Sequence, residues 1–230
     1  LLGDPLMVSV NANTKKVTIN YSTTTQSEAL DWLNAEQTSG KEFPFMYTQG
    51  QSIFTRSWIP IQDTPGLRIS YSADITVPNG MLPVMSAANP QIKNTTNTYS
   101  FEMNQPIPPY LIALAVGNLE FKKIDNRTGV YAEPNMLESS VSEFADMGKM
   151  VDAAEELYGE YDWERFDVIV LPPSFPFGGM ENPRLTFATP TIIAGDRSLV
   201  SLIAHELAHS WSGNLVTNAT WNDFWLNEGF

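Results

Sequence analysis

The residues best suited to chemistry are His205 and His209, the only two histidines of the 230-residue sequence. They stand four positions apart in the pattern His-Glu-x-x-His, with Glu206 directly after the first. On a helix, positions i and i+4 lie on the same face with Cβ atoms about 6 Å apart, which suits two imidazoles on one tetrahedral zinc ion. The alternative is a pair of ordinary histidines on a surface helix. The spacing and the apolar neighbours on both sides favour the metal site.

A catalytic zinc ion needs a third protein ligand and an open position for water. Because the sequence holds no cysteine and no further histidine, the third ligand has to be a carboxylate. Of the two acids that follow His209, we expect Glu228, in the apolar segment 225–229, to be the ligand and Asp223 to be an exposed loop acid. Glu206 would then be the general base that activates the zinc-bound water and returns the proton to a leaving amine. This arrangement predicts hydrolysis of an amide.

A second feature is the run Gly178-Gly-Met-Glu-Asn182, which lies in a loop flanked by prolines. Two consecutive glycines permit close approach of a bound peptide backbone, as pairing along a strand edge would require. Taken alone, however, the pattern fits a tight structural turn better than a binding site.

Alternation of apolar and polar residues predicts the elements of the N-terminal half. Residues 67–77 alternate throughout and predict a half-buried antiparallel strand, and shorter runs at 17–21 and 99–103 repeat the pattern. Residues 1–119 therefore read as mostly β.

Beyond residue 126 the periodicity changes to that of helices. Ser140 and Glu143 fit a capping box, and an apolar stripe from Phe144 to Leu157 predicts a core-facing helix that ends at Gly159. The other expected elements are a buried strand at 167–171, a strand at 185–193 and a helix at 198–211. The change marks a domain boundary near 119–130 and predicts an α+β fold, with domains at 1–119 and 120–230.

Composition narrows the classes of function. A formal net charge of −13 and a pI near 4.4 argue against a nucleic-acid partner, since phosphate binding needs clustered Lys and Arg. The absence of cysteine excludes disulfides, thiol catalysis and Cys-based zinc sites. The longest apolar run, 111–116, is far shorter than the roughly 20 residues of a membrane helix. The sequence opens without an initiator Met or a leader and closes within a continuing element, so we expect a segment of a longer protein.

Three motifs in this order and spacing resemble the zinc aminopeptidase family that includes alanyl aminopeptidase and leukotriene-A(4) hydrolase. They are Gly178-Gly-Met-Glu-Asn182, His205-Glu-Leu-Ala-His209 and Asn227-Glu-Gly229, and the likeness is greatest to the leukotriene-A(4) hydrolase branch. The similarity runs over nearly the whole chain, with further matching stretches at 36–41, 49–51, 62–65, 108–113, 171–176 and 211–217.

The resemblance implies an N-terminal antiparallel β domain followed by the first part of a thermolysin-like zinc peptidase domain. It implies one Zn²⁺ per chain on His205, His209 and Glu228, with Glu206 as the base. The implied substrates are peptides with a free N-terminus, whose α-amine Glu181 binds, so that cleavage is restricted to the terminal residue. The substrate-binding residues carried over from the family are Gln49, Gly50, Gln51, Pro176, Phe177, Gly178, Gly179, Met180 and Glu181.

Two alternatives stay open beside an aminopeptidase. The first is a bifunctional aminopeptidase and epoxide hydrolase, against which Phe177 and Gly50 count, because the leukotriene enzyme has tyrosine and cysteine there. The second is a catalytically incompetent, metal-stabilised binding module, although a purely structural zinc site is normally closed by four protein ligands and only three are visible. The family's transition-state tyrosine would lie beyond Phe230, so we expect the isolated segment to be inactive. Side-chain preference, oligomeric state and compartment cannot be read from the sequence.

Overall fold

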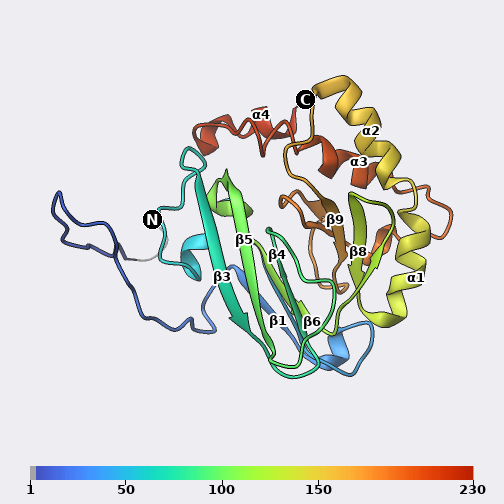
Figure 1. The fold of residues 1–230 in the computed structure, drawn as a ribbon, viewed down its shortest axis with the longest axis horizontal. Helices are drawn as coiled ribbons and strands as arrows, with labels where there is room; N and C mark the ends of the chain where they lie inside the picture. Colours follow the sequence, from blue (N-terminus) through green and yellow to red (C-terminus); the bar gives the residue numbers. More distant parts are fainter. Residues whose placement is uncertain (1–3, 230) are drawn as a thin grey trace.

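The N-terminal half of the chain forms an antiparallel sheet and a long two-stranded ribbon. The computed structural model describes residues 4–229. The sheet has the strand order β1-β2-β6-β4, with β1 at Leu30–Leu33, β2 at Phe45–Thr48, β4 at Leu82–Met85 and β6 at Leu114–Gly117. The ribbon pairs β3 (Ile69–Thr76) with β5 (Thr98–Ile107) (Figure 1). These elements confirm the predicted antiparallel N-terminal part.

The alternating pattern of residues 67–77 appears in β3 as expected. Its residues alternate between half-buried and exposed along the whole strand, because successive side chains of a strand point to opposite faces. The partner strand β5 alternates as well, and Tyr99, Phe101 and Met103 are buried in it. Both predicted strands are therefore confirmed.

A second sheet of five strands carries the C-terminal half, in the order β10-β11-β9-β8-β7. Strands β8, β9 and β11 run parallel to one another, and the two outer strands pair antiparallel. All residues of the three parallel strands are buried, as is typical of parallel strands covered on both faces. The bounds are β7 Glu120–Lys123, β8 Thr128–Ala132, β9 Phe166–Val170, β10 Gly179–Met180 and β11 Thr186–Ala188.

Helices α1 and α2 lie on the side of this second sheet away from the β3–β5 ribbon (Figure 1). Helix α1 packs against β7 and β8, and α2 packs against α3. The helices are α1 (Pro134–Glu143), α2 (Met147–Tyr158), α3 (Ser201–Ala208) and α4 (Trp225–Glu228). Short 3₁₀ segments lie at Ala35–Gln37, Thr55–Ser57, Pro109–Leu111, Pro190–Ile192 and Trp221–Asp223. No helix within residues 4–229 is long and apolar enough to cross a bilayer.

The single helix predicted from Ser140 to Gly159 is wrong, because two helices occupy this region. Ser140 lies inside α1, and its hydroxyl donates to the Met136 carbonyl oxygen (2.7 Å) instead of capping a helix. The Glu143 carboxylate is buried and accepts hydrogen bonds from backbone N–H groups of the loop that precedes α3. Part of the expected apolar stripe is present in α2, where Met147 and Val151 are buried, but Leu157 is 75% exposed.

Two other expectations fail in part. No strand forms at 17–21, where Val17, Ile19 and Tyr21 are exposed and no neighbouring strand pairs with them within residues 4–229. An isolated extended segment cannot satisfy its backbone groups or bury its apolar face. The strand predicted at 185–193 ends at Ala188, because Pro190 lacks an N–H donor and begins a 3₁₀ turn.

One contiguous apolar core joins the two halves of the chain, with residues such as Phe45, Tyr110, Val168 and Phe187 in the same cluster. Polar contacts also connect the two halves. The buried Glu133 carboxylate, just before α1, accepts from the backbone N–H groups of Ser39 (2.7 Å) and Gly40 (3.0 Å) in the loop after β1. The N-terminal sheet is therefore fixed against the part of the chain that carries the histidines. The boundary near 119–130 remains a prediction.

Candidate metal centre

Helix α3 presents the two histidines at the surface of the second sheet. It is shorter than the predicted helix, and His209 is its C-terminal cap with helical backbone angles. Ile203 and Leu207 are buried on the face that packs into the core, which leaves the opposite face for His205 and His209. The apolar residues thus fix the rotation of the helix about its axis, which leaves His205 half-exposed while His209 remains buried.

The imidazoles of His205 and His209 and the carboxylate of Glu228 converge on one point. The two Nε2 atoms lie 3.2 Å apart, and Glu228 Oε2 lies 3.7 Å from Nε2 of His205 and 3.5 Å from Nε2 of His209. Within residues 4–229 this is the only cluster of three His, Cys, Asp or Glu side chains arranged to hold a metal ion. Asp223 is not part of it, and its carboxylate instead accepts from the Thr220 hydroxyl.

The donor set fits zinc. Ligand atoms about 2.1 Å from a tetrahedral ion stand roughly 3.4 Å apart, close to the three observed separations. Nδ1 of His209 lies 2.9 Å from the carbonyl oxygen of Ser212, which can only accept, so Nδ1 carries a proton and the lone pair of the neutral tautomer lies on Nε2, which faces the cluster. Burial lowers the pKa of His205, and the neighbouring His209 lowers it further, which favours the neutral ring that a metal ligand requires.

Glu206 lies on the buried side of the cluster. Only 5% of its surface is exposed, and it sits under strand β10, where a Cβ atom at Gly179 would come within 2.3 Å of its Oε1. Burial raises the pKa of Glu206 to about 9, and the negative charges of Glu181 and Glu228 contribute to the increase. A nearby cation would oppose this shift and favour the carboxylate form, as a general base requires.

A hollow of about 240 Å³ joins these groups to the glycine-rich loop. Glu181 is buried in its wall, and burial raises the pKa of this carboxyl group. The Nε2 atom of Gln51 is also buried and lacks a hydrogen-bond partner among the described residues, which leaves a donor available to a ligand. The lining residues are Gln51, Phe177, Gly178, Gly179, Met180, Glu181, Leu202, His205, Glu206, His209 and Glu228.

Three of the substrate-binding residues carried over from the family do not line this hollow. Gln49 is buried behind it, where its Nε2 contacts the Met180 sulfur at 3.2 Å. Gly50 lies against Tyr110, whose carbonyl oxygen would be only 2.6 Å from an added Cβ. Pro176 is exposed at the start of the loop. Their binding roles therefore remain predictions.

The centre is more open than the apolar sequence around the motif suggested. The side chain of His205 is 51% exposed and that of Glu228 is 41% exposed, whereas that of His209 is only 6% exposed. The flanking Leu199 is also 46% exposed. The three groups of the cluster therefore range from buried at His209 to half-exposed at His205 and Glu228.

Two asparagines that no motif pointed to as functional hold Glu181. The Nδ2 atom of Asn214 donates to the Glu181 carbonyl oxygen at 2.7 Å, and Nδ2 of Asn227 donates to the Glu181 carboxylate at 3.4 Å. Asn227 belongs to the Asn-Glu-Gly motif, so its place beside Glu228 was the available signal. Asn214 lies in the stretch 211–217, and nothing in its spacing pointed to Glu181.

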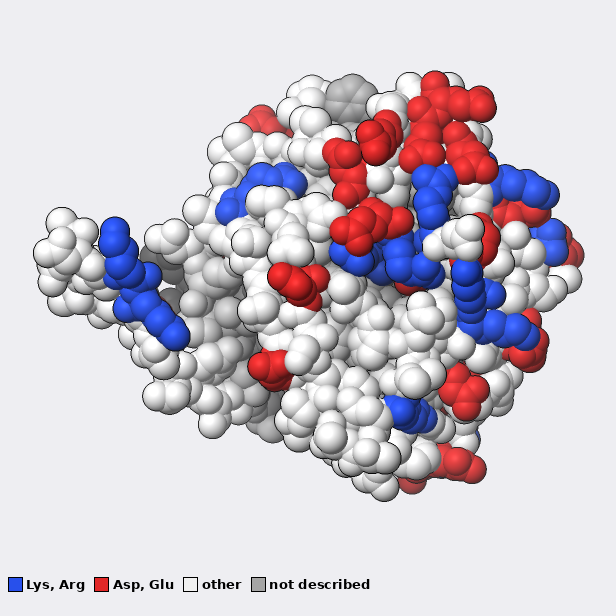
Figure 2. Space-filling view, viewed as in Figure 1, with Lys and Arg blue, Asp and Glu red and all other residues white. Residues whose placement is uncertain are grey.

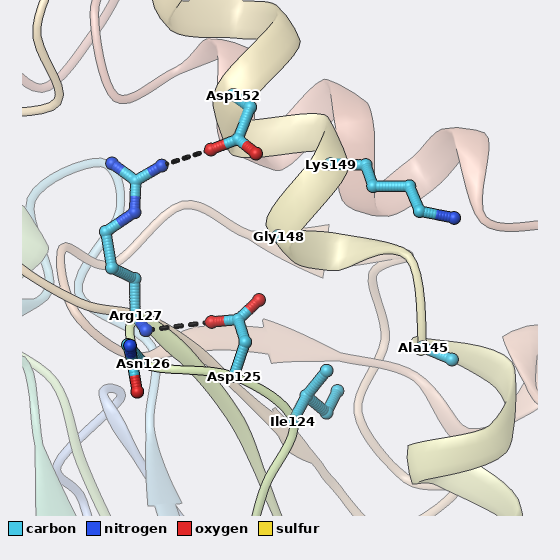
Figure 3. Close-up of a pocket in the computed structure, with 8 residues that line it drawn as sticks. All are labelled: Ile124, Asp125, Asn126, Arg127, Ala145, Gly148, Lys149 and Asp152. Carbon is cyan, nitrogen blue, oxygen red and sulfur yellow. Dashed lines mark hydrogen bonds and ion pairs between the residues drawn. The ribbon is translucent and has the colours of Figure 1, made fainter.

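A second hollow, of about 380 Å³, lies between the turn after β7 and helix α2 (Figure 3). Its four charged lining groups already have partners within the chain. Arg127 pairs with Asp152 (2.6 Å), Lys149 pairs with an aspartate on the preceding turn, and Asp125 accepts from the Arg127 backbone N–H (2.8 Å). Figure 2 shows acidic side chains gathered over the end of the molecule where α2 lies, as a solvated surface would present them. The metal centre is the better candidate site.

Comparisons with known proteins identify relatives of this chain. Aminopeptidase B from Homo sapiens is 52% identical over 200 residues, which are 86% of this chain and 31% of that protein. Leukotriene A-4 hydrolase from Xenopus laevis is 52% identical over 218 residues, 93% of this chain and 36% of that protein. The structure of yeast LTA4 hydrolase in complex with bestatin matches with a TM-score of 0.85 and 47% identity, over 90% of this chain and 32% of that chain.

The chain thus spans about a third of the length of the relatives it matches. Two family models align with it in succession. Residues 5–111 match the Peptidase M1 N-terminal domain, and residues 143–230 match the Peptidase family M1 domain. Because these two models of one family together cover most of the sequence, the chain belongs to peptidase family M1.

Proposed function

We propose that the protein containing this chain is a zinc-dependent aminopeptidase, which hydrolyses the N-terminal residue from peptides. The convergence of His205, His209 and Glu228 carries this proposal, because their donor atoms lie within 4.8 Å of one another beside a hollow that holds two more carboxylates. The similarity to aminopeptidase B and the family membership support it.

In this proposal each side chain has one role. His205, His209 and Glu228 hold the metal. The zinc ion, when bound, polarises the substrate carbonyl and lowers the pKa of its bound water toward 7. Glu206 accepts the water proton on its carboxylate and then delivers it to the nitrogen of the leaving peptide. Three protein ligands leave the fourth position open, as catalytic zinc sites require.

Glu181 provides the restriction to peptide ends. A buried carboxylate can form a charge-assisted hydrogen bond with the α-ammonium group of a substrate, whereas an internal peptide amide offers no such charge. The exposed fraction of Glu181 is only 4%, so a substrate that leaves this carboxylate unpaired is disfavoured. Strand β10, which precedes Glu181, pairs on one side only and offers an edge to the substrate backbone.

The test uses the full-length protein and a chromogenic amide of a single amino acid. We expect hydrolysis by the wild type, and loss of activity by about two to four orders of magnitude in Glu206→Gln with zinc retained at one ion per chain. Glu138→Gln, which makes the same change on the exposed surface of α1, is the matched control. Cleavage of internal bonds in N-acetylated peptides, without cleavage of free N-termini, would contradict the role of Glu181.

A second activity deserves a separate assay, because the identity to Leukotriene A-4 hydrolase equals that to aminopeptidase B. Incubation of the full-length protein with a fatty-acid epoxide and analysis of the products would show whether the same centre opens epoxides. Phe177 lines the hollow with half of its surface exposed, so its aromatic ring is available to an apolar substrate.

A further inference from the structure

The side-chain amide of Asn227 lies between the candidate amine site and the candidate metal site. Asn227 occupies α4 directly before Glu228, and only 3% of its surface is exposed. Its Nδ2 atom donates to Oε1 of Glu181 at 3.4 Å. One residue therefore contacts the carboxylate proposed to bind the amine, while its neighbour in sequence supplies a proposed metal ligand.

The orientation of this amide follows from its surroundings. A carboxylate can only accept, so the Nδ2 end of the amide has to face Glu181. The Oδ1 end is buried, has no hydrogen-bond partner among the described residues, and lies against Gly213, where an added Cβ would be 2.2 Å away. Because Gly213 leaves room for Oδ1, the amide can hold its donor toward the carboxylate.

Glu181 is fixed at two points. Asn214 binds its backbone carbonyl oxygen at 2.7 Å, which locates the main chain. Among side chains of residues 4–229, only Asn227 donates a hydrogen bond to the carboxylate itself. A glutamate side chain has three rotatable bonds, so a fixed backbone alone does not fix the position of its carboxylate. Asn227 supplies that second constraint.

We propose that Asn227 is a positioning residue, which holds the Glu181 carboxylate at a set distance from the metal ligands and thereby sets the preference for substrates with a free α-amine. The inference rests on the proposed aminopeptidase function. Because Asn227 and Glu228 are adjacent on one helical turn, any movement of α4 shifts the amide and the ligand together. The spacing between the ammonium group and the scissile carbonyl is then determined by α4.

The experiment compares two inhibitors on the full-length, zinc-loaded protein. One is leucine hydroxamate, and the other is the same hydroxamate without its α-amino group. We expect the wild type to bind the amine-bearing compound more tightly. We expect Asn227→Ala to reduce this preference by about tenfold, since a hydrogen bond to a charged group is lost, while zinc content and affinity for the des-amino compound change less than about threefold. In Asn227→Ala we also expect the KM of a peptide substrate to rise by a larger factor than kcat falls.

Controls separate this role from a structural one. Asn227→Leu keeps the side-chain volume and tests the same point if the alanine variant does not fold. Asn135→Ala removes an exposed amide that binds Ser39 and does not line the hollow, so it should leave the affinities for the two inhibitors unchanged. An unchanged preference in both Asn227 variants, or an equal loss of affinity for both inhibitors, would overturn the inference. A wild-type protein that does not distinguish the inhibitors would overturn the proposed function itself.

Discussion

Replacement of Gly213 by alanine should disturb the metal centre from a position that contributes no ligand. Gly213 follows α3 with a φ of +122°, a region that residues with a Cβ rarely adopt. The added Cβ would lie 2.2 Å from Oδ1 of Asn227 and 3.3 Å from Nδ1 of His209. The substitution therefore combines backbone strain with two close contacts at the site.

The size of the effect follows from these distances. Gly159, which ends α2 with a φ of +96°, has no atom within 4 Å of an added Cβ, so Gly159→Ala measures the strain alone. We expect that strain to cost about 1–2 kcal/mol. At Gly213 the oxygen of Asn227 must also withdraw by more than ~1 Å to reach ordinary van der Waals distance, which breaks the hydrogen bond to Glu181 and adds about 1.5–3 kcal/mol.

Two measurements on the full-length protein check this prediction. Denaturant unfolding of the metal-free protein should show a larger loss of stability in Gly213→Ala than in Gly159→Ala, by about 2 kcal/mol. Competition with a chromogenic chelator should show zinc affinity lowered at least tenfold in Gly213→Ala, at about 1.4 kcal/mol or more, and unchanged in Gly159→Ala. If the two variants behave alike in both assays, the close packing around Gly213 does not govern the site and the reasoning fails.

Two further predictions concern acid stability and the metal. Hydrogen bonds from the Arg127 guanidinium and, to a lesser extent, from the backbone N–H of Tyr161 hold the pKa of Glu155 below its ordinary value of 4.5. This carboxylate therefore contributes stability above about pH 4.5, and that stability is lost as the pH falls through the lower pKa of the folded state. Glu155→Gln should flatten the acid limb of a stability-versus-pH curve, whereas Glu156→Gln, a change on the exposed face of α2, should not. Removal of zinc with a chelator should lower the stability of the wild type by about 4 kcal/mol where zinc was present at a thousand times its Kd. In Glu228→Gln the same chelator should have a much smaller effect, and an equal effect would show that Glu228 is not a ligand.

The sequence alone was sufficient for the parts of the site that depend on local geometry. Two histidines four apart on a helix share a face whatever the rest of the fold does, so their convergence was predictable. Glu228 was reached by elimination, since the chain offers no cysteine and no third histidine. Strands β3 and β5 were predictable for the same reason, because a strand with one buried face must alternate apolar and polar residues along its length.

Burial and long-range contacts were not predictable in the same way. The segment around His205 is apolar, but whether its polar face is covered depends on which elements pack there. Ser140 and Glu143 show the same limit, since their spacing matches a capping box while Glu143 in fact binds the backbone of the loop before α3. The spacing of two residues shows only that a local hydrogen-bond pattern such as a capping box is possible. Backbone groups some fifty positions away can bind the same side chain more favourably.

The N-terminal part of the chain belongs to the site through contacts that no motif reveals. Arg68, just before β3, donates to the Asn214 carbonyl oxygen at 2.7 Å, and Asn214 in turn donates to the carbonyl oxygen of Glu181. The buried donor of Gln51 reaches the same hollow from the loop after β2. The zinc motif and the glycine-rich loop lie in the C-terminal part, yet the position of Glu181 depends on a guanidinium from the β-rich part. A catalytic segment separated from its N-terminal sheet should therefore lose the contact between Arg68 and Asn214, and with it one of the constraints on Glu181, the residue proposed to bind the amine.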